Sequence, residues 1–295
     1  MNSSVIIPNY NGEKLLTENL PLVIKAMNNP ANGICEIIVV DDGSWDGSVR
    51  LIKEKFPQVK VIKHKINRGF SASINTGVRG SSGDLLVLLN SDVIPDEDFL
   101  ISTLPHFKNP KVFAVSLHEK GYGWARGGFK DGYIQILPGE ESDSFHESFY
   151  VSGGSGVFRR SFWMSLGGMD EKLFSPFYWE DIDICYRAAK RGYQILWDPE
   201  SLVIHKHEST ISKLSKKYVA RVRERNQLLF IWKNITSASL TRRHLTGVLE
   251  RLVRHPGYLR IVIMALGRLG IARKARQKEI KESRVSDEAI FSGFN

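Results

Sequence analysis

The feature that most constrains the fold is an unbroken run of five aliphatic residues, Leu85–Leu89. A strand with one face in water alternates apolar and polar residues, so a run without alternation is typical of a strand covered on both faces. Three shorter apolar runs precede it, at 5–8, 36–40 and 61–63, and segments with helical spacing separate them. Strands joined by single helices form right-handed βαβ units, so the sequence predicts an α/β fold with a Rossmann-like, mostly parallel central sheet flanked by helices.

The remaining elements are predicted from the same periodicities. Helices are expected at 13–28, 46–56, 70–78, 96–107, 160–166 and 182–191, and further short strands at 194–197 and 202–205. Between 121 and 147, where glycine and aromatic residues dominate, we expect a hairpin or a mobile loop. From residue 211 the pattern is amphipathic and helical, with a break at Pro256, which predicts a C-terminal helical extension.

Charge is distributed unevenly along the chain. The net charge is +9, but residues 211–295 contain 19 lysines and arginines against six acidic residues, a net charge of +13. The rest of the chain therefore carries 22 basic and 26 acidic residues, a net charge of −4. We divide the chain into an α/β domain, 1–210, and a basic extension, 211–295. The extension should contact an anionic partner such as phospholipid.

The predicted location follows from cysteine usage and hydropathy. The two cysteines, Cys35 and Cys185, lie in apolar-periodic segments, which argues against a disulfide framework or a zinc cluster and fits a reducing compartment. No signal peptide is evident at the N-terminus. The apolar run between Arg260 and Arg268 has seven residues, whereas a transmembrane helix needs about 20. We expect a cytoplasmic protein.

The extension allows two interpretations. Its arginines could meet anionic lipid while its apolar face enters the interface, which would place the protein on the inner face of the cell membrane. Alternatively, its helices pack on the first domain or on a second subunit in a homo-oligomer, with the arginines in solvent. No nucleic-acid-binding module is recognised, so we expect no nucleic-acid partner.

Polar residues follow three of the predicted strands. They are Pro8, Tyr10 and Asn11 after the first, Asp41 and Asp42 after the second, and Asn90, Ser91 and Asp92 after the fourth. Ligands bind beyond the carboxyl ends of parallel strands, so these groups should converge on one crevice. Carboxylates without a glycine-rich phosphate loop favour a metal-bridged diphosphate. Each cluster alone also fits a turn that caps the next helix.

A second acidic group begins the helix predicted from residue 182. Asp181 falls in its first turn, where the helix dipole favours the ionised carboxylate. Asp183 and Arg187 are four residues apart, and we expect them to form a surface ion pair. An aromatic-rich segment, 174–179, leads into Glu180 and Asp181, and aromatic rings beside a carboxylate are typical of a sugar site. The alternative is ordinary enrichment of acids in a first helical turn.

Two histidines follow the last predicted strand of the first domain. One of His205 and His207 could complete a metal shell as a neutral imidazole, and the alternative is a pair of surface histidines. The other histidines singled out, His64, His106, His118 and His146, show no informative spacing.

These stretches together resemble glycosyltransferase family 2, in particular bacterial and archaeal members similar to rhamnosyl- and galactofuranosyl-transferases. The matching stretches are 5–12, 38–48, 67–77 with 83–92, 153–160, 167–187 and His205 to Arg225-Asn226, in family-like order over about 1–235. The resemblance implies a GT-A fold, an inverting mechanism, a nucleotide-sugar donor and Mg²⁺ or Mn²⁺ as cofactor.

The resemblance also implies roles for individual residues. The nucleotide would be held by Pro8, Tyr10, Asn11, Asp41, Asp42, Arg68, Asn90 and Ser91, and the metal by Asp92 and His205. Asn90 stands where the family's DXD motif begins with Asp, which removes one charge. Gly153 and Gly154 would let the backbone approach the donor sugar, near Trp124 and Trp179. Asp181 would be the catalytic base, and Glu180 would bind the acceptor or support Asp181.

The expected function is therefore metal-assisted transfer of a sugar from a UDP- or dTDP-sugar to a hydroxyl of a glycan acceptor, a lipid-linked cell-surface polysaccharide. A non-catalytic nucleotide-sugar-binding scaffold of the same fold is the alternative. A dinucleotide oxidoreductase is disfavoured, because no G-x-G-x-x-G follows the first strand.

Overall fold

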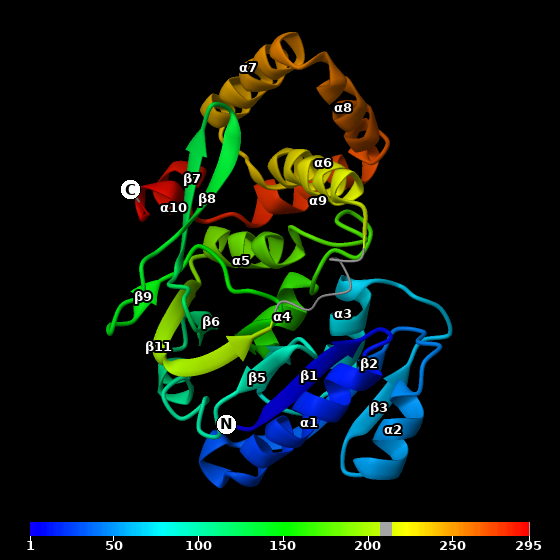
Figure 1. Ribbon diagram of the computed structural model, residues 1–295. Coiled ribbons are helices and arrows are strands. Elements are labelled where there is room, and N and C mark those ends of the chain that lie inside the picture. The colour runs from blue at the N-terminus through cyan, green and yellow to red at the C-terminus, as the bar shows by residue number, and fades with distance from the viewer. Residues whose placement is uncertain (207–213, 295) are drawn as a thin grey trace.

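The computed structural model describes residues 1–206 and 214–294, and its main sheet has the strand order β3-β2-β1-β4-β10-β6-β11-β5, with β9 paired to β11 (Figure 1). Its strands are β1 (Ser3–Asn9), β2 (Ile34–Asp41), β3 (Lys60–Lys63), β4 (Leu85–Leu89), β5 (Val93–Pro95), β6 (Val112–Glu119), β9 (His146–Glu147), β10 (Ser155–Arg159) and β11 (Gln194–His205). A separate hairpin consists of β7 (Ala125–Lys130) and β8 (Tyr133–Pro138). The α-helices are α1 (Glu13–Asn28), α2 (Ser48–Lys55), α3 (Phe70–Gly80), α4 (Arg160–Leu166), α5 (Glu180–Lys190), α6 (Lys216–Asn234), α7 (Ala238–Arg254), α8 (Leu259–Leu266), α9 (Leu269–Glu282) and α10 (Asp287–Ser292).

The first four strands form the predicted parallel sheet. Strands β3, β2, β1 and β4 pair in parallel, and β10 lies antiparallel between β4 and β6. From β1 the chain continues to β2 on one side and later returns to β4 on the other, so a topological switch point lies between β1 and β4. Ligands of open α/β sheets bind at such points, beyond the carboxyl ends of the strands. The predicted fold class is confirmed.

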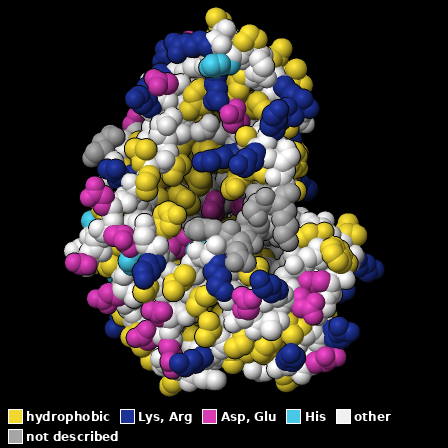
Figure 2. Space-filling view, in the orientation of Figure 1, with side chains coloured by type: hydrophobic (Ala, Val, Ile, Leu, Met, Phe, Trp, Pro, Cys, Tyr) yellow, Lys and Arg dark blue, Asp and Glu magenta, His cyan; other side chains and the backbone are white. Residues whose placement is uncertain are grey.

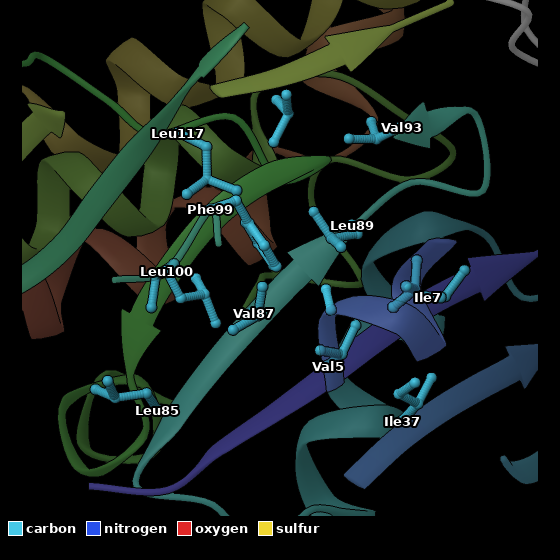
Figure 3. Close-up of a cluster of buried hydrophobic side chains, with 14 of the residues drawn as sticks. Val5, Ile7, Ile37, Leu85, Val87, Leu89, Val93, Phe99, Leu100 and Leu117 are labelled. Atoms are coloured by element: carbon cyan, nitrogen blue, oxygen red, sulfur yellow. The ribbon is translucent and has the colours of Figure 1, made fainter. Parts of the chain in front are cut away.

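Buried side chains cover both faces of this sheet. Alternate residues of a strand point to opposite faces, and Val5, Val87 and Leu89 lie together in one hydrophobic cluster, as Figure 3 shows. Residues of α1 belong to the same cluster. On the other face, Ile6 and Leu88 pack with α3, α4 and α5. The unbroken apolar run of β4 is fully buried, as expected of a strand covered on both sides.

Three predictions of local structure were wrong. The segment 96–107 is not an α-helix but turns followed by a short 3₁₀ helix, Leu104–Lys108. Pro105 removes an amide N–H that an α-helix needs there. The two strands predicted at 194–197 and 202–205 are one strand, β11, with a register shift between Trp197 and Leu202.

The hairpin expected between 121 and 147 is confirmed as β7–β8.

The third wrong prediction is the surface pair on α5. The Arg187 Nε atom donates to Asp183 Oδ2 at 2.8 Å, but both side chains are buried. Lys233 and Asn234 of α6 also donate to the Asp183 carboxylate, at 2.9 and 2.8 Å. Because these cations and the amide surround Asp183, its pKa lies below the usual value although burial alone would raise it. The i,i+4 spacing predicts the pair but not the helix that covers it.

The C-terminal helices share a core with α5 and the β7–β8 hairpin. Leu228 and Phe230 of α6 pack with Trp179 and Tyr186, and α8, α9 and α10 contribute to the same cluster. Helices α7 and α8 form the end of the molecule opposite β2 and β3 (Figure 1). Within 1–206 and 214–294, no helix is long and apolar enough to cross a bilayer.

Candidate active site

The loops after β1 and β2 are tied together by side-chain hydrogen bonds. Asn9 Nδ2 donates to Asp41 Oδ1 at 3.1 Å, and the Ser44 amide donates to Asp41 Oδ2 at 3.2 Å. Asn11, which has a left-handed backbone (φ 52°), donates from its amide to Ser44 Oγ and accepts from the Trp45 amide. Asp41 is fully buried, so it holds the two loops in the conformation that forms the crevice and is not exposed at the crevice surface.

Asp42 organises a third loop. Its two carboxylate oxygens accept from the amides of Arg68 and Gly69 at 2.9 and 2.8 Å, and His64 Nδ1 lies 2.7 Å from Oδ1. The Arg68 side chain is exposed and pairs with Glu171 at 3.2 Å. Pro8 and Tyr10 are half-buried at the same end of the sheet. No role was predicted for His64, although its position directly after β3, at the carboxyl end of a strand, could have indicated one.

The segment after β4 contacts a pair of glycines before β10. The Asn90 amide donates to the Gly154 carbonyl at 2.8 Å. A Cβ on Gly154 would lie 2.3 Å from Asn90 Nδ2, and one on Gly153 would lie 3.0 Å from the Phe70 ring, so both glycines permit close packing here. The Ser91 carbonyl accepts from Asn19 Nδ2 at 2.8 Å.

Asp92 and His205 lie together, as the predicted metal site requires. His205 Nε2 is 3.2 Å from Asp92 Oδ1, and His205 Nδ1 is 3.2 Å from Glu119 Oε1. Burial lowers the pKa of His205, but the bonds to Asp92 and Glu119 outweigh it and raise the pKa to about 9. The protonated His205 ring thus places a positive charge between the carboxylates of Asp92 and Glu119. Glu119, the last residue of β6, is not among the site residues predicted from the sequence.

A metal ion would use only part of this group. Within the described residues, no set of three or more His, Cys, Asp or Glu side chains is arranged to hold a metal ion. Mg²⁺ and similar cations in nucleotide sites commonly take only one or two protein ligands and complete their shell with phosphate oxygens and water. Asp92 and a deprotonated His205 match that need, and they would have to exchange their mutual contact for the metal. His207, the other candidate ligand, lies outside the described residues.

Asp181 lies beside the same glycines. The Gly153 amide donates to Asp181 Oδ2 at 3.4 Å, and the Ile182 amide donates to Oδ1 at 2.8 Å. Gly153 contacts Asp181 while Gly154 contacts Asn90, so the backbone of two adjacent residues connects the predicted base to the strand end that carries Asp92. The sequence predicted an ionised Asp181 from the helix dipole, but burial raises its pKa.

Glu180, the residue before Asp181, is a second buried acid. Its Oε2 atom has no hydrogen-bond partner within the described part of the chain. Burial first, and then the charge of Asp181, raise its pKa to about 8. At neutral pH Glu180 is therefore mostly protonated.

The two predicted sugar-contacting tryptophans line different cavities. Trp124 lies with His205 and Tyr150 in a cavity of about 360 Å³, where its ring stacks on His146 at 3.6 Å between centroids. Trp179 lines a larger cavity described below. Tyr150 lines the same cavity as Glu119 and His205, and burial first and then the charges of Asp181 and Glu119 raise its pKa.

The loop that leads into α5 is held by the C-terminal helices. Tyr178 and Trp179 both adopt left-handed backbone angles (φ 70° and 78°), which cost free energy in residues other than glycine and are found mainly at functional sites. Asn226 Nδ2 lies 2.6, 2.9 and 2.9 Å from the carbonyl oxygens of Phe174, Phe177 and Tyr178. Arg225, whose pKa burial and then the charge of Arg268 lower to about 10, donates to the Ser175 carbonyl at 2.7 Å.

Arg268, just before α9, adds three more bonds from the other side. Its Nη1 atom donates to the carbonyls of Lys172, Leu173 and Ser175 at 3.1, 2.7 and 3.0 Å. Arginines that satisfy several loop carbonyls fix the backbone in one conformation. The buried Arg225 and the half-buried Arg268 are therefore positioning residues for the first turn of α5.

The sheet topology and the acidic crevice define a Rossmann-like α/β protein with a polar ligand site at its switch point. Residues 4–166, more than half of the chain, match the model of glycosyl transferase family 2. The chain belongs to this family.

Relatives and solved structures agree with that assignment. A pre-mycofactocin glycosyltransferase of Mycobacterium tuberculosis is 31% identical over 185 residues, which cover 59% of this chain and 38% of the relative. A poly-beta-1,6-N-acetyl-D-glucosamine synthase of Staphylococcus epidermidis is 24% identical and covers 81% of this chain and 58% of its own length. The chain thus spans roughly 38% to 58% of these two relatives.

Among solved structures, GalNAc-T7 with UDP, GalNAc and Mn²⁺ superposes with a TM-score of 0.66 at 17% identity, over 88% of this chain and 57% of that one. The S. aureus TarS fragment 1–349 with UDP-GlcNAc superposes with a TM-score of 0.60 at 18% identity, over 99% and 92% of the two chains. At these identities the likeness establishes the shared fold.

Proposed function

We propose that this chain is an inverting glycosyltransferase that moves a sugar from a UDP- or dTDP-sugar to a hydroxyl of a lipid-linked glycan. The supporting observation is the connection of Asp181 through Gly153 and Gly154 to the strand end that carries Asp92. A base and a diphosphate site on one crevice are what direct displacement at an anomeric carbon needs. Assignment to the rhamnosyl- and galactofuranosyl-like branch, and a boundary near residue 210, remain predictions.

In the proposed reaction the acceptor oxygen bonds to the anomeric carbon as the bond from that carbon to the diphosphate oxygen breaks. Asp181 takes the acceptor proton, and the nucleoside diphosphate leaves with the bonding electrons. The amides of Gly153 and Ile182 orient the Asp181 carboxylate. Glu180 supports Asp181 or binds the acceptor. Asp92 and His205 would hold Mg²⁺ or Mn²⁺, which when bound would offset charge on the leaving diphosphate.

A thermal-shift screen tests the donor class. We expect UDP, dTDP and their sugars to raise the melting temperature only with Mn²⁺ or Mg²⁺, because a ligand that binds the native state stabilises it by mass action. GDP and ADP serve as matched nucleotides. Slow Mn²⁺-dependent release of free sugar from the stabilising donor would distinguish an enzyme from a scaffold. If no nucleotide sugar raises the melting temperature in the presence of metal, both the enzyme and the nucleotide-sugar-binding scaffold are contradicted.

We further propose that α7 and α8 lie on an anionic membrane surface on the cytoplasmic side. Leu245, Leu249 and Val253 form one exposed stripe on α7, and Val253 is 82% exposed. Leu259, Ile263 and Leu266 form a similar stripe on α8, and arginines 242, 254 and 260 flank the two. Exposed aliphatic stripes bordered by arginine are typical of interfacial helices.

Vesicle sedimentation tests this surface. The Leu249→Glu/Val253→Glu variant should bind phosphatidylglycerol vesicles at least tenfold more weakly than the unmodified chain. A matched variant with two glutamates at exposed α9 positions, Gln277→Glu/Ile280→Glu, should retain most of it. Equal binding by all three proteins, or no preference of the unmodified chain for anionic over neutral vesicles, would count against the membrane contact.

A further inference from the structure

A cavity of about 840 Å³ lies between the β7–β8 hairpin and α6. Tyr178 and Trp179, directly before the first turn of α5, form part of its wall. Ile136 lines both this cavity and the smaller one that contains His205, so the two are neighbours. Figure 2 shows a hollow on this face with an acidic side chain at its floor, hydrophobic side chains on one side and basic ones at its upper edge.

The walls of this cavity differ in chemistry. Ile134 and Ile136 of the hairpin, with Val219 and Ala220 of α6, give it apolar surface. Lys216 and Arg223 of α6 add positive charge, and neither has a carboxylate within ion-pairing distance in the part of the chain that the structure describes. An apolar wall beside cations that no carboxylate neutralises is complementary to an anionic amphiphile.

The third cation of the cavity is already engaged. Arg251 of α7 pairs with Glu224 at 3.0 Å, and its guanidinium lies 4.1 Å from the centre of the Tyr258 ring. Its contribution is therefore mainly to hold α7 against α6. Because α7 supplies a lining residue, the cavity connects the region of Asp181 with the helices proposed to contact the membrane.

Arg223 is also close to the catalytic region. Burial dominates the raised pKa of Tyr150 and the charge of Asp181 adds to it, while the charge of Arg223 acts in the opposite direction. Tyr150 is thus within electrostatic range of both Asp181 and Arg223. Arg223 lines the same cavity as Trp179, which is two residues before Asp181, so a ligand whose phosphate lies at Arg223 would have its adjoining sugar near the proton acceptor.

We infer that this cavity binds the phosphate or diphosphate and the first part of the hydrocarbon chain of the acceptor, a sugar joined through that anionic group to a lipid. The inference rests on the proposed function, because it names the acceptor class of the same site. Lys216 and Arg223 bind the phosphate oxygens, and the isoleucine wall of β8 packs against the chain. The sugar hydroxyl then faces Asp181.

Isothermal titration calorimetry of the full chain with farnesyl diphosphate tests this site, without divalent metal so that the donor site does not compete. The Lys216→Glu/Arg223→Glu variant should bind at least tenfold more weakly than the unmodified chain. The Lys217→Glu/Arg221→Glu variant makes the same charge change on α6 at two residues outside the cavity lining, and it should remain within twofold. Farnesol and inorganic diphosphate should each bind at least tenfold more weakly than farnesyl diphosphate.

Each alternative result overturns a stated part of the inference. If both double variants bind farnesyl diphosphate equally weakly, the ligand is attracted by the overall positive charge of α6 and not by the cavity. If inorganic diphosphate binds as tightly as farnesyl diphosphate, the apolar wall does not contribute to binding. Mn²⁺-dependent hydrolysis of the nucleotide sugar is measured in the unmodified chain and in the Lys217→Glu/Arg221→Glu variant, and the two rates should agree. Its absence from the unmodified chain would defeat the proposed function, whatever the cavity binds.

Discussion

The Asp181→Asn variant is expected to fold and bind donor normally but to transfer sugar about 10²–10⁴-fold more slowly, the range that general-base catalysis contributes. Asparagine keeps the shape of the side chain and one acceptor oxygen, so it retains one of the two bonds from the Gly153 and Ile182 amides, but it cannot take the acceptor proton. Single-turnover transfer and nucleotide binding, measured in parallel, separate lost chemistry from lost affinity. Transfer close to that of the unmodified chain would refute the assignment of the base.

Glu180→Gln provides the matched control on the neighbouring residue. Because burial and Asp181 hold the pKa of Glu180 near 8, its side chain is mostly neutral at pH 7, and glutamine imitates that form. We expect less than a tenfold loss. The raised pKa of Asp181 also predicts that transfer by the unmodified chain falls with decreasing pH at values above those where an exposed aspartate titrates. A greater loss in Glu180→Gln than in Asp181→Asn would reverse the two roles.

The Asp92→Asn variant should lose most of the metal-dependent part of nucleotide binding. The amide retains the volume of the side chain but removes the charge that lies 3.2 Å from His205 Nε2. Loss of one electrostatic contact to a leaving group commonly costs about 10²–10³-fold in turnover. We therefore expect transfer to fall by about that factor, and the Mn²⁺-dependent rise in melting temperature with UDP to shrink toward zero.

Asp84 offers a control on the same strand. It directly precedes β4, at the opposite end from Asp92, and is exposed. Asp84→Asn changes the net charge equally but should leave both transfer and the response to Mn²⁺ unchanged. A full Mn²⁺ response in Asp92→Asn would show that the cation binds elsewhere.

The parallel half of the fold could be predicted from sequence because its strands are short apolar runs with helices between them. Strand β4 was predicted with its observed bounds, and β1, β2 and β3 within two residues. Strand β10 was not predicted, since Ser155–Arg159 contains glycine and polar residues and is buried only because it lies between β4 and β6. The segment 96–107 failed because its helical spacing could not override the effect of Pro105.

The candidate site was predictable where a residue follows a strand or begins a helix. Asp42, Asp92 and Asp181 were found in that way. Glu119 and Tyr150 were missed because their positions beside His205 and Asp181 depend on pairing between segments far apart in sequence. The predicted ionisation of Asp181 considered the helix dipole alone, and burial depends on packing that spacing cannot give.

The bonds from Asn226 and Arg268 to the segment 172–178 have a practical consequence for work on this molecule. A chain shortened at residue 240 would lose the proposed lipid-facing stripes and, at the same time, the guanidinium that braces the approach to Asp181. With such a truncation, an effect on membrane binding could not be separated from an effect on the rate of sugar transfer. Point substitutions on the outer sides of α7 and α8 leave that brace intact, so they can separate where the protein resides from how fast it works.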